Sequence, residues 1–308
     1  MKLLIRFGIV DIPDERRAHI RVTPRGGGLA LVLILIICGP SFEYLINESV
    51  TYSSKMVPIV CLISLISFLD DVRTISIVVR LIVHLFCAAL FVYFFISPFF
   101  PHHHELPFLF NIIALSLGLT AFLNIYNFMD GIDGITAIES IHLTLTILIL
   151  CVLKSESIIN LQLITGVSIL VCACSISFLL FNWPPAKVFI GDVGSISFGF
   201  LIGLCLLSIS ISDKNLFVAA GIASLYYLAD AGLTILIRLI NREKIWQPHL
   251  KHFFQKAVKK GMPIRQIVKK IIFCNLLLML LSISALQFPV FSSVFAIITV
   301  ALTLNNFT

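Results

Sequence analysis

Apolar runs close to the roughly 20 residues that a helix needs to cross a bilayer recur along the whole chain, and they constrain its fold most. Runs such as 29–38 and 271–281 are apolar on every face, whereas the strands of an outer-membrane barrel alternate between apolar and polar residues. Of the 308 residues, 59% are hydrophobic and 12% are charged. The sequence therefore predicts an all-α, polytopic membrane protein that forms a single domain over residues 1–308.

About ten membrane-spanning helices are expected from hydropathy. Their predicted bounds are 27–46, 56–69, 77–97, 106–126, 135–153, 158–181, 195–212, 215–240, 271–287 and 289–304. Lys and Arg mark the cytoplasmic loops of membrane proteins, and of the 22 such residues only Lys55, Lys154 and Lys214 fall on the side opposite the N-terminus. We therefore expect the N-terminus in the cytoplasm, and we attribute the net charge of +6 to topology and not to nucleic-acid binding.

Carboxylates lie at the ends of several apolar runs: Asp70, Asp71, Asp130, Asp133 and Asp192. An ionised side chain at the bilayer centre costs roughly 2.5–3.5 kcal/mol, so such acids are expected at the membrane surface or in a functional site. The predicted topology places all of them on the cytoplasmic side. A transporter would carry polar groups through its whole depth, so this arrangement favours an enzyme that acts on a lipid headgroup from the cytoplasm.

The residue types narrow the chemistry. Carboxylates and amides are hard oxygen ligands, which suit Mg²⁺ or Mn²⁺, and the eight cysteines show no spacing typical of a zinc site. Gly26–Gly28 and the segment 191–195 each precede a predicted span, where backbone N–H groups can bind an anion. A hard metal, a phosphate cradle and a membrane surface together indicate phosphoryl transfer to or from a lipid phosphate.

Motifs in these segments resemble those of the polyprenyl-phosphate N-acetylhexosamine-1-phosphate transferases, a family of the glycosyltransferase family 4 type. They are Asp11-Ile-Pro with His19 and Thr23-Pro-Arg-Gly-Gly-Gly, Phe68-Leu-Asp-Asp, Asn124-x-x-Asn127-x-x-Asp130-Gly-x-Asp133-Gly, and Val188-Phe-x-Gly-Asp192-x-Gly-Ser195. The resemblance implies transfer of a sugar 1-phosphate from a UDP-N-acetylhexosamine to undecaprenyl phosphate, with release of UMP and use of Mg²⁺. It also implies a multi-pass protein of the bacterial inner membrane, surrounded by lipid, with its active site facing the cytoplasm. Whether the chain forms a homodimer stays open.

The segment Trp246-Gln-Pro-His249-Leu-Lys-His252-Phe-Phe-Gln255 resembles the branch that initiates O-antigen or other surface polysaccharides. N-acetylglucosamine or a derivative is then the expected sugar. The alternatives are a phospho-N-acetylmuramoyl-pentapeptide transferase of peptidoglycan synthesis and an inactive lipid-binding relative. Family members carry a further span before the Asp-x-Pro segment, where this chain has ten residues, so we expect either that the family's first helix is missing or that the start of the sequence is wrongly assigned.

The resemblance also implies roles for individual residues. Asp192 is the expected Mg²⁺ ligand, and Asp70 and Asp71 are expected nearest the acceptor phosphate, as proton acceptor or as support of the metal site. The strip formed by Asn127, Asp130 and Asp133 is expected to bind nucleotide or metal, with the two aspartates catalytic. The expected substrate-binding residues on other segments are Arg25, Arg238, His249 and His252.

Structural roles compete with each of these assignments. Asp70 and Asp71 could cap a helix, Asp130 and Asp133 could form a turn, and Asp192 is a typical N-cap residue. Other polar residues favour the structural alternative. Asp230, His84 and His142 are expected to be packing polars within spans, His102–His104 a solvated loop, and Lys256–Lys270 an interfacial amphipathic segment.

Overall fold

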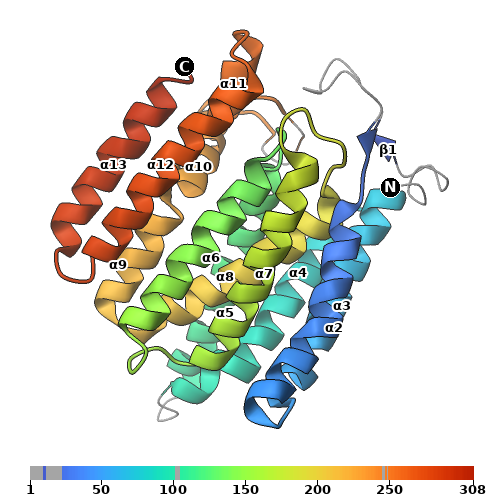
Figure 1. Cartoon of the computed structure of the whole chain (residues 1–308), viewed down its shortest axis with the longest axis vertical. Coiled ribbons are helices and arrows are strands. Elements are labelled where there is room, and N and C mark those ends of the chain that lie inside the picture. Colours follow the sequence, from blue (N-terminus) through green and yellow to red (C-terminus); the bar gives the residue numbers. More distant parts are fainter. Residues whose placement is uncertain (1–9, 12–22, 101–104, 245–246, 248) are drawn as a thin grey trace.

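The computed structural model describes residues 10–11, 23–100, 105–244, 247 and 249–308, which form a bundle of long helices (Figure 1). Two short antiparallel strands, β1 (Val10–Asp11) and β2 (Thr23–Pro24), lie at one end. The helices are α2 (Gly27–Asn47), α3 (Thr51–Val72), α4 (Ile77–Phe91) continued by η1 (Val92–Ile96) and η2 (Ser97–Phe99), α5 (Glu105–Phe128), α6 (Ile135–Leu153), α7 (Leu161–Asn182), α8 (Gly191–Ser212), α9 (Lys214–Ala223), α10 (Leu225–Ile240), α11 (Phe253–Lys259), α12 (Ile264–Ser284) and α13 (Pro289–Asn305).

The predicted spans overlap these helices, and the all-α polytopic fold is confirmed. Within the described residues, seven helices are long and apolar enough to cross a membrane. The predicted span 215–240 is interrupted at Ser224, where α9 and α10 meet at a bend of 68°, and this pair would be the eighth span. Helices α3 and α13 are not among these candidates, so the number of ten spans stays a prediction.

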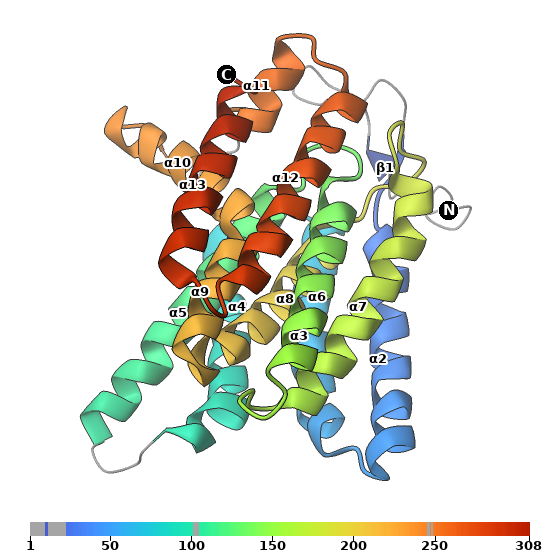
Figure 2. The ribbon, with the colours of Figure 1, turned by 60° about the vertical axis from the view of Figure 1, so that its left-hand side comes forward.

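Helix α8 forms the centre of the bundle and packs against α2, α3, α5, α6, α7 and α9 (Figure 2). Small residues allow this close packing, because apolar side chains in a bilayer gain little from contact with one another and backbones must approach. Gly199 lies against Tyr126 and Gly203 against Phe122, both on α5. Ser197 hydrogen-bonds to Ser64 of α3 at 2.8 Å.

The outer helices present apolar side chains to their surroundings. On α4, for example, Val78, Ile82 and Phe86 are exposed at a spacing of one helical turn. A stripe of this kind would be unstable in water and is typical of a lipid-facing surface.

The helices alternate in direction, so segments far apart in the sequence meet at one end of the bundle. Helices α2, α4, α6 and α8 begin at this end, and α3, α5 and α7 end there (Figure 2). We call it the site end, because it brings together the segments with the predicted site residues Arg25, Asp70, Asp71, Asn127, Asp130, Asp133 and Asp192.

Candidate functional site

An arginine held between two carboxylates forms the centre of the site. Arg25 precedes α2, and its Nη2 atom lies 2.7 Å from Asp192 Oδ1 and 2.9 Å from Asp71 Oδ1. The Asp71 side chain is 1% exposed, whereas that of Arg25 is 31% exposed. Burial opposes the charge on Arg25, but Asp192, Asp71 and Asp130 together hold the pKa of its guanidinium above its ordinary value. Residues from four separate segments therefore share one electrostatic environment.

A second arginine, Arg80 in the first turn of α4, was not singled out from the sequence. Its Nη1 atom forms an ion pair with Asp70, and it lies 3.5 Å from Asp192 Oδ2. Asp70 Oδ1 also accepts a hydrogen bond of 2.8 Å from the Ile75 backbone N–H. An arginine inside an apolar span is by default a functional candidate, and this signal could have identified Arg80.

The N-terminus of α8 is occupied by a carboxylate of the chain itself. Asp71 accepts hydrogen bonds of 3.0 Å from the backbone N–H groups of both Asp192 and Val193. The positive end of the helix dipole and these N–H groups stabilise such an anion. The prediction that this helix start offers free N–H groups to a phosphate is therefore wrong for Asp192 and Val193. Asp71 instead fixes the backbone that carries Asp192.

The glycines before α2 bring two helix starts into contact. The Gly27 and Gly28 N–H groups donate to the carbonyls of Phe189 and Ile190 at 2.9 and 2.8 Å. A Cβ atom on Gly28 would lie only 2.3 Å from the Gly194 Cα. The N–H groups of Gly27 and Gly28 are thus also engaged, contrary to the predicted cradle. These glycines let the segment with Arg25 pack directly on the segment with Asp192.

The loop between α5 and α6 carries Asp130 and Asp133. Asp130 accepts a hydrogen bond from the Thr136 hydroxyl, and burial raises its pKa to about 7, with a smaller contribution from nearby Asp192. Asp133 Oδ2 accepts a hydrogen bond of 2.9 Å from the backbone N–H of Ala186. Asp130 can therefore exchange a proton near neutral pH, while Asp133 ties its loop to the loop before α8.

Two further side chains fix this region. Asn182, at the end of α7, accepts a hydrogen bond of 2.8 Å from Gly134 N–H and donates one of 2.9 Å to Val188 O. Asn127 accepts a hydrogen bond from the Ser195 hydroxyl in the first turn of α8. These contacts join α5 to α8, and the end of α7 to the start of α6 and to the loop before α8. Asn182 had no predicted role.

The predicted histidines lie in the segment that leads into α11. The rings of His249 and His252 are 4.9 Å apart, and burial lowers the pKa of His249 to about 4, so this ring is neutral at pH 7. His252 Nδ1 lies 3.1 Å from Asp230 Oδ1. A Cβ atom on Gly131 would come within 3.0 Å of Gln255 and Phe254. The start of α11 thus packs on the loop that carries Asp130.

Arg238 has a more local set of contacts. Its Nε donates to Glu243 at 3.1 Å and its Nη2 to the Lys244 carbonyl at 2.7 Å, which folds the end of α10 onto the following loop. It also contributes to the electrostatic environment of His249. Arg238 therefore belongs to the histidine segment, and its substrate-binding role stays a prediction.

Other polar residues singled out from the sequence lie within the helices. His84 contacts Asn124 at 3.4 Å, and His142 Nε2 lies 2.9 Å from the Ala223 carbonyl at the break between α9 and α10. The basic segment 256–270 covers most of α11 and the start of α12. The predictions for His19 and His102–His104 fall outside the described residues.

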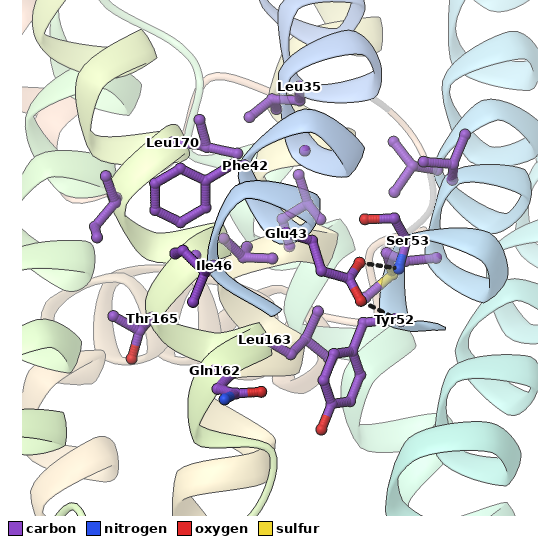
Figure 3. A pocket seen from close by; sticks show the side chains of 18 of the residues that line it. Leu35, Phe42, Glu43, Ile46, Tyr52, Ser53, Gln162, Leu163, Thr165 and Leu170 are labelled. Carbon is purple, nitrogen blue, oxygen red and sulfur yellow. Dashed lines mark hydrogen bonds between the residues drawn. The ribbon is translucent and has the colours of Figure 1, made fainter. Parts of the chain in front are cut away.

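A cavity of about 300 Å³ lies elsewhere, among α2, α3 and α7 (Figure 3). Its lining is mostly apolar, and the buried carboxylate of Glu43 accepts hydrogen bonds from the Tyr52 and Ser53 N–H groups at the start of α3. Because α3 begins at the end opposite Asp71, this cavity is separate from the site. Its lining offers no cation to a sugar nucleotide.

The carboxylates of the site fit a hard divalent cation. In the part of the chain that the structure describes, no three His, Cys, Asp or Glu side chains form a group that could hold a metal by themselves. Mg²⁺ is commonly bound by one or two carboxylates, with water and substrate phosphates completing its shell. Asp192, whose side chain is 20% exposed between Arg25 and Arg80, could provide such a carboxylate.

Comparison with known proteins agrees with this geometry. Residues 54–210, just over half of the chain, match glycosyl transferase family 4, and this segment contains Asp70, Asp71, Asp130, Asp133 and Asp192. The chain belongs to this family. The matched segment runs from α3 to α8, so it supplies every acid of the site, while Arg25 and the histidine segment lie on either side of it.

Relatives within the family cover most of the chain. A probable undecaprenyl-phosphate N-acetylglucosaminyl 1-phosphate transferase of Bacillus subtilis is 27% identical over 277 residues, which cover 87% of this chain and 74% of the relative. A phospho-N-acetylmuramoyl-pentapeptide-transferase of Aliarcobacter butzleri is 27% identical, covering 82% and 79%. A decaprenyl-phosphate N-acetylglucosaminephosphotransferase of Mycolicibacterium smegmatis is 28% identical, covering 65% and 53%.

Proposed function

We propose that this family 4 protein transfers N-acetylhexosamine 1-phosphate from a UDP-sugar to undecaprenyl phosphate and releases UMP. The observation that carries the proposal is the convergence of Asp70, Asp71 and Asp192 around Arg25 and Arg80 at one end of the bundle. The names of the Bacillus subtilis and Mycolicibacterium smegmatis relatives support a polyprenyl-phosphate acceptor. N-acetylglucosamine or a derivative is the proposed sugar, for the first membrane step of O-antigen or other surface-polysaccharide synthesis.

The site end faces the cytoplasm of the inner membrane in this proposal. The distribution of Lys and Arg supports this orientation, because the exceptions Lys55, Lys154 and Lys214 lie near helix ends opposite the site. A UDP-sugar would then approach from the cytoplasm, while the lipid phosphate approaches from the membrane surface.

In the proposed reaction, an oxygen of the lipid phosphate forms a bond to the sugar-bearing phosphorus as the diphosphate bond to UMP breaks. A phosphate monoester with a second pKa near 6 is mostly dianionic at neutral pH, so alignment and charge neutralisation are the main requirements. A Mg²⁺ ion held by Asp192 would supply positive charge at the diphosphate. Arg25 and Arg80 are the cations placed to bind phosphate oxygens.

The carboxylates have different tasks in this scheme. Asp71 holds the backbone of Asp192 through two N–H groups and is itself almost fully buried, so it orients the proposed metal ligand. Asp70 orients Arg80. Asp130, with its pKa raised to about 7, can hold or release a proton beside these charges. His249, His252 and Arg238 would contact the diphosphate or the sugar from the segment before α11.

The direct test is UMP release by detergent-purified protein supplied with UDP-N-acetylglucosamine and undecaprenyl phosphate. We expect release that needs both substrates, is abolished by EDTA and is restored by Mg²⁺. The variant Asp192→Asn should lose at least about 100-fold in rate, since a group that stabilises transition-state charge contributes this much.

A matched control is Asp213→Asn. Asp213 caps α9 at the opposite end of the bundle, where it accepts hydrogen bonds from the Asn215 and Leu216 N–H groups. This variant should turn over at the parental rate. Parental turnover by Asp192→Asn would refute the metal assignment. Release only with UDP-N-acetylmuramoyl-pentapeptide would replace the proposed sugar with the peptidoglycan precursor, and no release with any UDP-N-acetylhexosamine would refute the enzyme proposal.

A further inference from the structure

A buried carboxylate holds the histidine segment in place. Asp230, on α10, is 0% exposed and has three hydrogen-bond partners. Its Oδ1 lies 3.1 Å from His252 Nδ1 and 3.0 Å from the Phe253 backbone nitrogen, and its Oδ2 lies 3.4 Å from the Phe254 nitrogen. All three partners belong to the short segment that opens α11.

The position of Asp230 depends on the bend in its span. It lies six residues after Ser224, where the chain turns by 68° between α9 and α10. The carbonyl freed at this break, that of Ala223, is contacted by His142 of α6. The break therefore directs α10 so that a buried carboxylate of this helix meets the loop before α11. A charged side chain in such a helix is retained only where partners compensate its desolvation.

His252 is equally enclosed. It is 2% exposed, its ring stacks on Phe254 at 5.6 Å, and its backbone N–H donates to the Gln255 side chain at 3.2 Å. Phe254 and Gln255 in turn touch Gly131, next to Asp130. The Asp230 contacts are thus connected to the loop of the acidic site through two neighbouring side chains.

We propose that Asp230 is a positioning residue for His252. The carboxylate accepts a hydrogen bond from the Nδ1–H group of the imidazole, which in the neutral ring fixes one tautomer and leaves Nε2 as the acceptor. The Phe253 and Phe254 N–H groups bind the same carboxylate, so ring orientation and the start of α11 are set together. The effect of this arrangement on turnover rests on the proposed function, because it assumes that the histidine segment contacts the substrate.

The pairing can be tested without an activity measurement. Protein labelled with ¹⁵N-histidine should show a ring signal typical of the Nδ1–H tautomer that is missing from His252→Ala. This signal should move or disappear in Asp230→Ala. It should persist in Asp213→Ala, which removes a carboxylate that only caps a helix. An unchanged His252 signal in Asp230→Ala would overturn the proposal even if the protein proves not to be a transferase.

A double-mutant cycle tests the functional part. Removing a residue that orients an active-site group typically costs about 10–100-fold, so Asp230→Ala should lower kcat/KM by this factor. Because Asp230 acts through His252, the double variant with His252→Ala should be no worse than the more impaired single variant. Asp230→Asn keeps an oxygen acceptor and should recover part of the loss. The proposal would be overturned if the losses of the two single variants multiplied in the double variant. It would also be overturned if folded Asp230→Ala kept the parental kcat/KM. Failure of the parent to release UMP would count against the proposed function alone.

Discussion

Replacing Gly28 by alanine tests the contact on which the site is built. A Cβ atom at Gly28 would lie 2.3 Å from the Gly194 Cα, 2.5 Å from its nitrogen and 2.6 Å from the Ile190 carbonyl oxygen. Ordinary contacts begin at 3.4 Å, and all three atoms belong to the backbone, so no side-chain rotation relieves the overlap. The starts of α2 and α8 would have to separate by about 1 Å.

This separation affects both stability and geometry. Overpacking of a closely packed contact costs about 1–3 kcal/mol, and the 2.8 Å hydrogen bond from Gly28 N–H to Ile190 would be strained as well. At roughly 2–4 °C for each kcal/mol, the melting midpoint should fall by roughly 2–12 °C. Arg25 and Asp192 lie on the two separating segments, and a shift of about 1 Å can cost about 100-fold in rate.

The assay compares detergent-purified Gly28→Ala with Gly118→Ala by thermal melting and by UMP release. Gly118 lies on the exposed face of α5, where a Cβ atom would meet no neighbour within 4 Å. Its replacement should be neutral or stabilise the helix by about 0.5–1 kcal/mol. The reasoning is refuted if Gly28→Ala melts and turns over like the parent, or if Gly118→Ala falls by as much as Gly28→Ala.

The loops of the site provide two further predictions. The Thr136 hydroxyl donates to Asp130 and so lowers the pKa of that carboxyl. Thr136→Val removes this hydroxyl, so the limb of the kcat–pH profile near pH 7 should move to higher pH. An unmoved limb would exclude Asp130 from the reaction. The same pKa has a consequence for stability. The pKa of Asp130 lies above the ordinary 3.8, so the stability that protonated Asp130 contributes is complete below about pH 3.8 and is lost as the pH rises through about 7. Over that interval the melting midpoint of Asp130→Asn should therefore fall less than that of the parent. Asn182→Ala leaves Gly134 N–H and the Val188 carbonyl without their partner and should cost about 1–3 kcal/mol in thermal melting. An unchanged melting midpoint in Asn182→Ala would assign no weight to these two bonds.

Much of the fold follows from local sequence. The predicted spans 27–46 and 135–153 match α2 and α6 closely, because membrane insertion depends on the hydropathy of a continuous segment. The bend at Ser224 was not predicted, since neither proline nor glycine occupies the break. It is held by contacts from other helices, including His142 of α6.

The sequence singled out the acids of the candidate site but not the partners with which they form hydrogen bonds and ion pairs. The acids stood out because carboxylates are rare in apolar surroundings. That Asp71 would cap α8 could not be foreseen, because its partners Asp192 and Val193 lie more than 100 residues further along the chain. Arg80 was overlooked because a single arginine near a helix start also fits a role in topology alone.

The sequence by itself determined that this chain forms apolar helices and which acids gather at one end of the bundle. Each of these properties depends on segments of about 20 residues that partition into a bilayer largely independently of one another. The tertiary structure decided which carboxylate faces which arginine, that Asp71 and not a free N–H group occupies the start of α8, and that Asp230 holds His252. Hydrogen bonds and ion pairs act over a few ångströms in space, so these choices appear only once the helices have packed.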